Sequence, residues 1–389
     1  MTRRLPTSYP FLLASLALVA CDKKQDAPRL PDTSAATLAQ PPHAEAAPAA
    51  APQPEASDAE KDPLRGADKD MRAVMDELAT LGGKPIETLS AEEARKQPTP
   101  ADAVAALLKR EGKNQAPEMV GRVLESTIPT AAGALPIRVY TPKEGAGPFP
   151  VVVYYHGGGF VIATNDTYDA TPRALANGAD ALVVSVEYRK APENKFPSAH
   201  DDAYAAYLWV LEHASSIGGD PKNVAVAGES AGGNLAANVA IRARDERKQQ
   251  PKHELLVYPV ASSDVNSESY LKYAHAKPLN KAMMSWFTDK YFRTSQDAAD
   301  PRIDLVNAKL VGLPPTTIIN AEIDPLLSDG ELLAKRLKAA EVPVEQKTYE
   351  GVTHEFFGMG ATVADAKDAL EYASKRLKSA LYEVKLGAR

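Results

Sequence analysis

From residue 150 onward the chain alternates short, apolar, β-branched segments with runs of helical length. Short strands that are apolar along their whole length are typical of a parallel sheet covered by helices on both faces. The alternation therefore predicts an α/β fold with a mostly parallel central sheet. The expected strands are 150–156, 181–188, 223–228, 254–260, 316–321 and 344–350, and the expected helices lie near 171–177, 201–213, 231–243, 330–340 and 364–381.

Two other patterns come before this alternation. Segments 120–128 and 135–141 alternate in polarity around a Gly-containing turn, as a β-hairpin does. Further upstream, 70–81 carries apolar residues at helical spacing, and a second helical segment follows Pro98 and Pro100. We therefore expect a helical cap or arm ahead of the sheet.

A polar segment with several aromatic residues, 262–304, interrupts the alternation. In open α/β sheets ligands bind at the carboxyl ends of the strands, so motifs at those ends are candidate functional sites. The expected organisation is a signal peptide (1–20), a Pro/Ala-rich tether (21–65), a helical cap or arm (66–118) and a catalytic domain (119–389) that contains the 262–304 insertion.

The N-terminus predicts export. Two arginines precede an apolar stretch at 11–20, which is shorter than the roughly 20 residues of a membrane-spanning helix and matches a secretory signal. The stretch ends in LVAC, which resembles the lipobox of bacterial lipoproteins, where Cys21 would become lipidated. An ordinary signal with a chance cysteine is the alternative. We expect a membrane-anchored protein on the periplasmic or cell-surface side, with no internal disulfide because Cys21 is the only cysteine.

Composition and net charge indicate which kinds of molecule the protein can bind. The tether is rich in Ala and Pro and lacks apolar periodicity, so it cannot bury enough surface to fold. The formal net charge is −6 and no long basic run occurs, which argues against a nucleic-acid-binding protein. A small molecule and, through Cys21, a membrane are the expected partners.

The sequence GESAG at 228–232 is a G-x-S-x-G motif between an expected strand and an expected helix. A strand that turns sharply into a helix strains its central residue, here Ser230, and requires small neighbours such as Gly228 and Gly232. The turn exposes the serine Oγ at a helix N-terminus, where developing negative charge is favoured. Ser230 is therefore the candidate nucleophile, and a plain serine turn is the alternative.

A serine nucleophile needs a base that accepts its proton. In the chain order that accompanies G-x-S-x-G turns, the acid and then the histidine follow the serine, which leaves His253, His275 and His354. His253 begins an apolar strand and His275 lies in the polar insertion. His354 follows the last expected strand and is the preferred base.

The acid that orients the base is expected near the end of strand 316–321. Asp324 lies three residues beyond that strand and precedes Pro325, which cannot extend a sheet. Glu322 would lie where the strand is still buried, and Asp329 is expected to cap the helix from residue 330. Asp324 is therefore preferred. In the resulting mechanism a histidine takes the serine proton, and water releases the acyl-enzyme.

Five motifs occur together in one order, and the chain resembles the hormone-sensitive-lipase-like family of α/β-hydrolase esterases across roughly residues 70–385. They are HGGGF (156–160), YRKAPENKFPSAHDD (188–202), GESAGG (228–233), DPLLSDG (324–330) and GVTHEFFG (351–358). The resemblance implies an α/β-hydrolase fold with a helical cap, and serine carboxylesterase activity on short- to medium-chain esters, without metal or cofactor.

The resemblance also implies an oxyanion hole beside the nucleophile. Its donors would be the N–H groups of Gly158, Gly159 and Ala231, and Gly157 would be a further donor or a hinge. A side chain at Gly158 is then expected to lower the rate more than the stability. The residues expected to support the loop and the nucleophile are His156, Gly228, Glu229 and Gly232.

Three departures from the family pattern stand out. Glu229 replaces an aspartate, Lys190 replaces a leucine, and 327–329 (Leu-Ser-Asp) replaces Arg-Asp-Glu. None of them touches the expected triad.

Three other functions compete with that of an esterase. A phosphate-binding loop is disfavoured because HGGGF lacks both a Gly-Lys-Ser/Thr continuation and a G-x-G-x-x-G pattern. An amidase or peptidase remains open, since the same triad serves both. A ligand-binding protein on this scaffold, as in the plant gibberellin receptor, would be favoured by a missing histidine, but all three triad residues are present.

Overall fold

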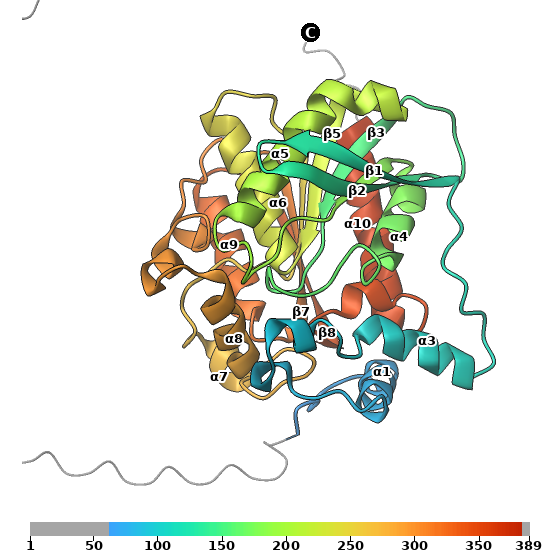
Figure 1. Ribbon diagram of the computed structural model, residues 1–389, viewed down its shortest axis with the longest axis vertical. Helices are drawn as coiled ribbons and strands as arrows, with labels where there is room; N and C mark the ends of the chain where they lie inside the picture. Colours follow the sequence, from blue (N-terminus) through green and yellow to red (C-terminus); the bar gives the residue numbers. More distant parts are fainter. Residues whose placement is uncertain (1–61, 383–389) are drawn as a thin grey trace, which may run out of the picture. The chain divides into compact units, whose positions relative to one another are not determined.

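The computed structural model describes residues 62–382. Within them eight strands form a single sheet in the order β1-β2-β4-β3-β5-β6-β7-β8 (Figure 1). β2 pairs antiparallel with β1 and β4, and all other neighbours are parallel. The strands are β1 (Arg122–Thr130), β2 (Gly133–Thr141), β3 (Phe149–Tyr155), β4 (Leu182–Val186), β5 (Gly219–Glu229), β6 (Glu254–Val257), β7 (Thr316–Ile323) and β8 (Val344–Thr353).

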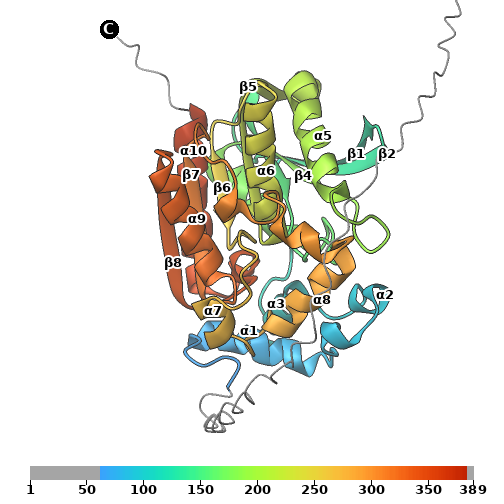
Figure 2. The same cartoon turned by 90° about the vertical axis from the view of Figure 1, so that its left-hand side faces the viewer.

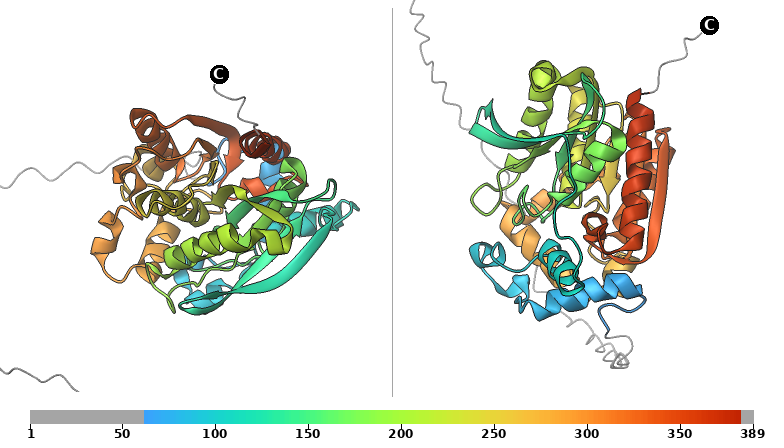
Figure 3. Two further views of the ribbon diagram at one scale, coloured as in Figure 1. Left: turned by 90° about the horizontal axis from the view of Figure 1, so that it is seen from above. Right: turned by 90° about the vertical axis from the view of Figure 1, so that its right-hand side faces the viewer.

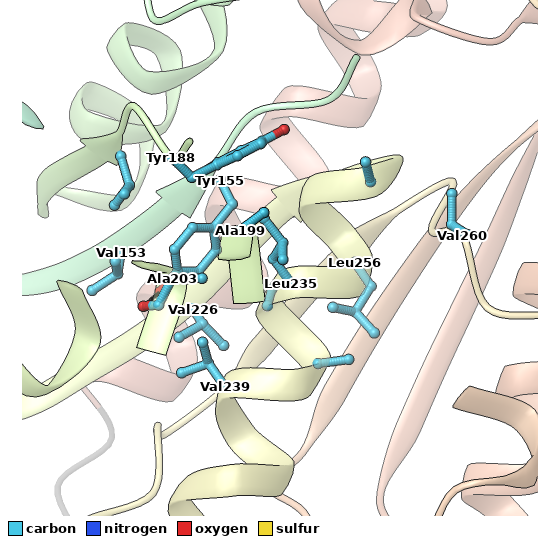
Figure 4. Packing of buried hydrophobic residues seen from close by; sticks show 14 of the residues in the cluster. Val153, Tyr155, Tyr188, Ala199, Ala203, Val226, Leu235, Val239, Leu256 and Val260 are labelled. Carbon is cyan, nitrogen blue, oxygen red and sulfur yellow. Dashed lines mark hydrogen bonds between the residues drawn. The ribbon is translucent and has the colours of Figure 1, made fainter. Parts of the chain in front are cut away.

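Helices cover both faces of the sheet, as the apolar strands predicted. Val153 and Tyr155 point to the face covered by α5 (Ser198–His213), α6 (Ala231–Asp245) and α9 (Leu327–Ala339), where Ala203 and Leu235 also pack (Figures 2 and 4). Alternate residues such as Val152 and Tyr154 point to the opposite face, covered by α4 (Ala170–Ala179) and α10 (Ala364–Tyr382) (Figure 3). The α/β-hydrolase fold class is confirmed.

The remaining helices gather at one end of the sheet (Figures 1 and 2). They are α1 (Lys69–Thr80), α2 (Ala91–Ala94), α3 (Pro100–Arg110), α7 (Glu268–Lys272) and α8 (Lys281–Tyr291), with 3₁₀ turns η1 (Ile86–Thr88), η2 (Ala214–Ile217), η3 (Ser295–Ala299), η4 (Leu305–Asn307) and η5 (Phe356–Met359) elsewhere along the chain. α3 begins with Pro100 after a Thr99–Asp102 capping box, as the sequence indicated. The Trp286 indole donates to Leu89 O at 2.9 Å, which joins α8 to the N-terminal segment.

Some boundaries differ from the predictions. α9 begins at Leu327, so Asp329 lies inside the helix and does not cap it. Leu64 is buried against α1, and its carbonyl accepts from Arg72 at 2.6 Å, so the last residues assigned to the tether belong to the folded part. The predicted signal peptide, Cys21 and the tether up to residue 61 lie outside the described residues. No helix within 62–382 has the length and apolar character needed to cross a membrane.

Candidate active site

Ser230 occupies the sharp turn between β5 and α6. Its backbone has φ +56° and ψ −118°, a strained conformation for a residue with a side chain. A Cβ on Gly228 would lie 2.1 Å from Gly232 O, and a Cβ on Gly232 would lie 1.9 Å from Tyr155 O. Neither position can hold a side chain, so the crowding expected of the G-x-S-x-G turn is present.

Ser230, His354 and Asp324 form one hydrogen-bonded series. The Nε2 atom of His354 lies 3.0 Å from Ser230 Oγ, and its Nδ1 atom lies 2.6 Å from Asp324 Oδ2. All three side chains are buried. The backbone N–H of Leu326 donates to Asp324 Oδ1 at 2.8 Å and holds the carboxylate in place. This arrangement can pass a proton from the serine to the imidazole.

The charges around His354 favour its protonated form. Burial acts to lower the pKa of His354, but the charge and hydrogen bond of Asp324 raise it, with smaller contributions from Glu355 and Glu229, so that the pKa lies above its ordinary value. The imidazolium that forms when the serine loses its proton is therefore stabilised within the site.

The topology explains why these residues meet. Asp324 directly follows β7 and His354 directly follows β8, so both lie at the carboxyl edge of the sheet where β5 delivers Ser230. His253 lies at the opposite edge, just before β6, buried and with Nε2 2.9 Å from Thr317 Oγ1. His275 is exposed between α7 and α8.

The two competing acids have other contacts. Glu322 is half-buried rather than buried as expected, and its side chain accepts from the Gly351 N–H of the neighbouring strand β8 at 3.0 Å. Asp329 is fully buried, and its Oδ2 accepts from the N–H groups of Ala261 and Ser262 at 2.9 and 2.8 Å. Asp329 thus fixes the segment after β6.

The three glycines of HGGGF follow β3 and lie beside the sharp turn that carries Ser230. Gly158 and Gly159 have φ of +98° and +58°. In the described part of the chain no hydrogen-bond partner is found for either backbone N–H, whereas Gly158 O accepts from the N–H groups of Val161 and Ile162. These two N–H groups, with that of Ala231 at the start of α6, are therefore available to a ligand oxygen.

Gly157 and Gly158 lack a side chain for different reasons. A Cβ on Gly157 would lie 2.3 Å from Tyr168 Oη, so Gly157 is bare because a tyrosine occupies the space. A Cβ on Gly158 would lie 2.4 Å from Ile162 O. Together with its positive φ, this clash means that a side chain at Gly158 would lower stability as well as rate, which corrects the expectation of a mainly kinetic effect.

His156 contacts the glycine loop and a neighbouring tyrosine. Its Nδ1 lies 2.7 Å from Gly157 O, and its ring stacks on Tyr188 with centroids 4.4 Å apart. Burial lowers the pKa of His156 to about 4, so the ring is neutral at physiological pH. These contacts attach His156 to the glycine loop, where the sequence predicted a loop-orienting residue.

Glu229 is a buried carboxyl directly before Ser230. It accepts from the Tyr154 hydroxyl at 2.5 Å and from the Tyr258 hydroxyl. Burial raises the pKa of Glu229 to about 7, although both hydrogen bonds act to lower it. The Glu229 carboxyl thus binds two tyrosine hydroxyls at once.

Sequence reasoning missed another carboxyl, that of the half-buried Glu355, although it directly follows His354. Burial raises the pKa of Glu355. Its Oε1 accepts from Tyr168 Oη at 2.5 Å, and Tyr168 is the side chain that occupies the space beside Gly157. The only sequence signal for Glu355 was its adjacency to the base.

Lys190 and the 327–329 segment, the two other departures from the family pattern, also make side-chain contacts. Lys190 forms an ion pair with Glu187, which in turn accepts from the Asn165 N–H at 2.7 Å. Ser328 exchanges two hydrogen bonds with Ser269, at 3.2 and 3.0 Å, and so joins α9 to α7.

A cavity of about 1080 Å³ opens above Ser230 and reaches His354, Gly158 and Gly159. Among the helices at the carboxyl edge of the sheet, α1 and α8 contribute most to its wall. Apolar side chains line much of the wall, among them Met75, Ile86, Phe160, Ile162, Val260, Met284, Phe287 and Ile303.

The fold and this site together define a serine hydrolase of the α/β-hydrolase type. The alpha/beta hydrolase fold family matches residues 152–358 of the chain. The chain belongs to this family, in the hormone-sensitive-lipase-like group that its motifs predicted, and it is an enzyme of the carboxylesterase class.

Three similar proteins illustrate the relationship. Carboxylesterase NlhH of Mycobacterium tuberculosis is 40% identical over 252 residues, which cover 64% of this chain and 79% of that protein. The ethyl acetate hydrolase of Pseudomonas putida is 32% identical over 304 residues, covering 76% and 92%. The solved structure of an esterase from Pyrobaculum calidifontis matches with a TM-score of 0.70 and 38% identity over 75% of this chain and 94% of that one.

Proposed function

We propose that the protein hydrolyses short- to medium-chain acyl esters with Ser230 as nucleophile, His354 as base and Asp324 as the acid that orients the base. The observation that carries this proposal is the unbroken series of hydrogen bonds from Ser230 Oγ through both imidazole nitrogens to the carboxylate. Ser230 Oγ attacks the ester carbonyl carbon while His354 Nε2 takes its proton. His354 then gives that proton to the leaving alcohol as the ester C–O bond breaks.

The second half of the reaction uses the same groups. Water attacks the acyl carbon of the acyl-enzyme while His354 accepts a proton from it, and the carboxylic acid leaves as Ser230 regains its hydrogen. The N–H groups of Gly158, Gly159 and Ala231 are the proposed donors to the oxyanion in both steps. The uncommitted N–H groups of the two glycines support this role. Loss of such a donor costs roughly 10²- to 10³-fold in kcat in another serine hydrolase.

The cavity supports the proposed substrate class. The apolar side chains of its wall favour an acyl chain. One similar protein bears the name ethyl acetate hydrolase, which supports a short acyl group.

A chain-length series tests the proposal. Wild-type protein should hydrolyse p-nitrophenyl esters with a maximum between acetate and octanoate, and Ser230→Ala should abolish turnover without unfolding the protein. His275→Ala, a change at an exposed histidine outside the cavity, is the control for His354→Ala. Faster cleavage of matched anilides would favour an amidase, and a protein that binds these compounds without turnover would favour a ligand-binding role.

We also propose that lipid on Cys21 anchors the enzyme to a membrane on the exported side. The support is the N-terminal sequence pattern alone, since Cys21 lies outside the described residues. Replacement of Cys21 by serine should move the protein from the membrane fraction to the soluble fraction. Retention of that variant in the membrane fraction would contradict the lipid anchor.

A further inference from the structure

Three consecutive residues of the glycine loop have positive φ: Gly158, Gly159 and Phe160, the last at +63°. Glycine adopts such angles freely, but a phenylalanine does so only where its surroundings hold it. Phe160 directly follows the two proposed oxyanion donors. Whatever holds its backbone in place therefore also fixes the direction of their N–H groups.

The ring of Phe160 is held by helix α8. It stacks on the ring of Tyr291, with centroids 4.2 Å apart and planes inclined by 12°. Both side chains are buried. One turn earlier on the same helix, Phe287 packs so closely on Gly159 that a Cβ there would lie 2.2 Å from its Cδ1. Residues four apart share one helix face, so a single face of α8 covers the loop at two adjacent residues.

Tyr291 is fixed in turn by a buried series of hydrogen bonds. His200 Nδ1 lies 2.9 Å from Tyr291 Oη, and His200 Nε2 lies 2.9 Å from Asn234 Oδ1. Asn234 Nδ2 already donates to two backbone carbonyls, at 3.0 and 3.3 Å. The amide oxygen must therefore accept from His200, which places the imidazole proton on Nε2 and leaves Nδ1 to accept from the tyrosine.

The series ends at the nucleophile. Asn234 lies one turn after Ser230 in α6, and its backbone N–H donates to Ser230 O at 3.2 Å. Burial lowers the pKa of His200 to about 4, so the imidazole is neutral at physiological pH and the direction of the hydrogen bonds is kept. One continuous set of contacts thus joins the loop, α8, α5 and the helix that carries Ser230.

We propose that Tyr291 is a positioning residue that fixes the oxyanion loop relative to Ser230, through Phe160 on one side and through His200 and Asn234 on the other. This inference rests on the proposed function, because it assumes that the loop donates to the oxyanion. Loss of Tyr291 lets the Gly158 and Gly159 N–H groups move away from the reacting oxygen. The transition state is then destabilised more than the bound ester.

The test compares two tyrosines. Tyr291→Phe removes only the hydroxyl and Tyr291→Leu removes the stacked ring. Tyr207 supplies the matched controls, Tyr207→Phe and Tyr207→Leu, because it is also fully buried and donates to a carbonyl, Gln249 O, at 2.8 Å, but lies outside the cavity. For each variant we would measure kcat and KM with p-nitrophenyl butyrate, and the affinity for a trifluoromethyl ketone and for its methyl ketone analogue. The former adds Ser230 Oγ to its carbonyl carbon and places an oxyanion in the loop.

Tyr291→Leu should lower kcat by about tenfold or more, as small displacements of catalytic groups do, with a KM within about twofold of wild type. Its affinity for the trifluoromethyl ketone should fall by the same factor as kcat/KM, while affinity for the methyl ketone stays unchanged. Tyr291→Phe should show a smaller loss in the same direction. If circular dichroism shows that Tyr291→Leu is unfolded, the measurements on Tyr291→Phe test the proposal instead.

Unchanged trifluoromethyl ketone affinity in the folded Tyr291 variants would overturn the inference, as would equal losses in the Tyr207 variants. Failure of the proposed function looks different: the wild-type protein would then not bind the trifluoromethyl ketone covalently, or Ser230→Ala would retain turnover.

Discussion

The ring of Tyr258 packs against the imidazole of His354, with centroids 4.4 Å apart. The hydroxyl of the same tyrosine donates to Glu229, the residue before Ser230. The buried Glu229 carboxyl therefore binds Tyr258, whose ring packs on His354. Glu229 is also the chain neighbour of Ser230. Such a shared support ties the position of His354 to that of Ser230.

Glu229 should make the stability of the protein depend on pH. Its pKa rises from 4.5 to about 7 on folding because the carboxyl is buried, so the protein takes up a proton when it folds. The associated stability is present below pH 4.5 and is lost as the pH rises through 7, by on the order of 3 kcal/mol at about 1.4 kcal/mol per pKa unit. Glu229→Gln cannot ionise and lacks this loss.

The melting temperature measures the effect. Glu229→Gln should gain about 5 °C relative to wild type on going from pH 5 to pH 8, because only the wild-type carboxyl ionises in that range. Glu350→Gln, at an exposed position on β8, should show no such trend. An equal difference between Glu229→Gln and wild type at both pH values would contradict the assignment of a raised pKa to Glu229.

Asp324 and Asp329 should respond differently to replacement by asparagine. Asp324→Asn leaves the geometry in place but favours the wrong imidazole tautomer, so kcat should fall by about 10³- to 10⁴-fold. Asp329→Asn keeps an oxygen for the Ala261 and Ser262 N–H groups and should retain kcat within about tenfold. Steady-state kinetics on both variants decide the assignment, and similar losses in the two would remove the reason to prefer Asp324 as the acid.

The meeting of Ser230, Asp324 and His354 was predictable because each of them lies in a local pattern at the end of a strand. Ser230 lies in G-x-S-x-G, Asp324 precedes a proline after β7, and His354 follows the last strand. Local patterns and the topology of parallel sheets together bring such residues to one edge. The same reasoning placed all three side chains at the carboxyl edge of the sheet, where the structure brings them within hydrogen-bond distance.

The tyrosines that support the site, and the role of Asp329, were not predictable in this way. Tyr258 and Tyr291 are far in sequence from the side chains they contact, and nothing local distinguishes them from other buried tyrosines. Asp329 resembled a helix cap, but the helix begins two residues earlier and the carboxylate binds backbone N–H groups 67 and 68 residues away. Contacts of this kind depend on packing between elements, which local propensity does not encode.

Gly159 and Phe287 should be energetically coupled. Gly159→Ala places a Cβ against the Phe287 ring, so kcat/KM should fall by about 10²-fold as the loop is pushed from its position. Phe287→Ala frees that space, and the double variant should regain at least about tenfold over Gly159→Ala. A double-mutant cycle on p-nitrophenyl acetate hydrolysis, with Phe287→Ala as the reference, measures the coupling. Purely additive losses would show that the close contact does not set the loop position.

The most direct test of the account is the site of covalent modification. The protein would be incubated with a p-nitrophenyl alkylphosphonate ester, which transfers its phosphonyl group to an activated serine with release of p-nitrophenol, and peptides would be analysed by mass spectrometry. We expect one adduct, on Ser230, formed in parallel with loss of esterase activity and absent from Ser230→Ala and from His354→Ala. Modification of a different residue in step with inactivation, or esterase activity that survives in Ser230→Ala, would contradict it.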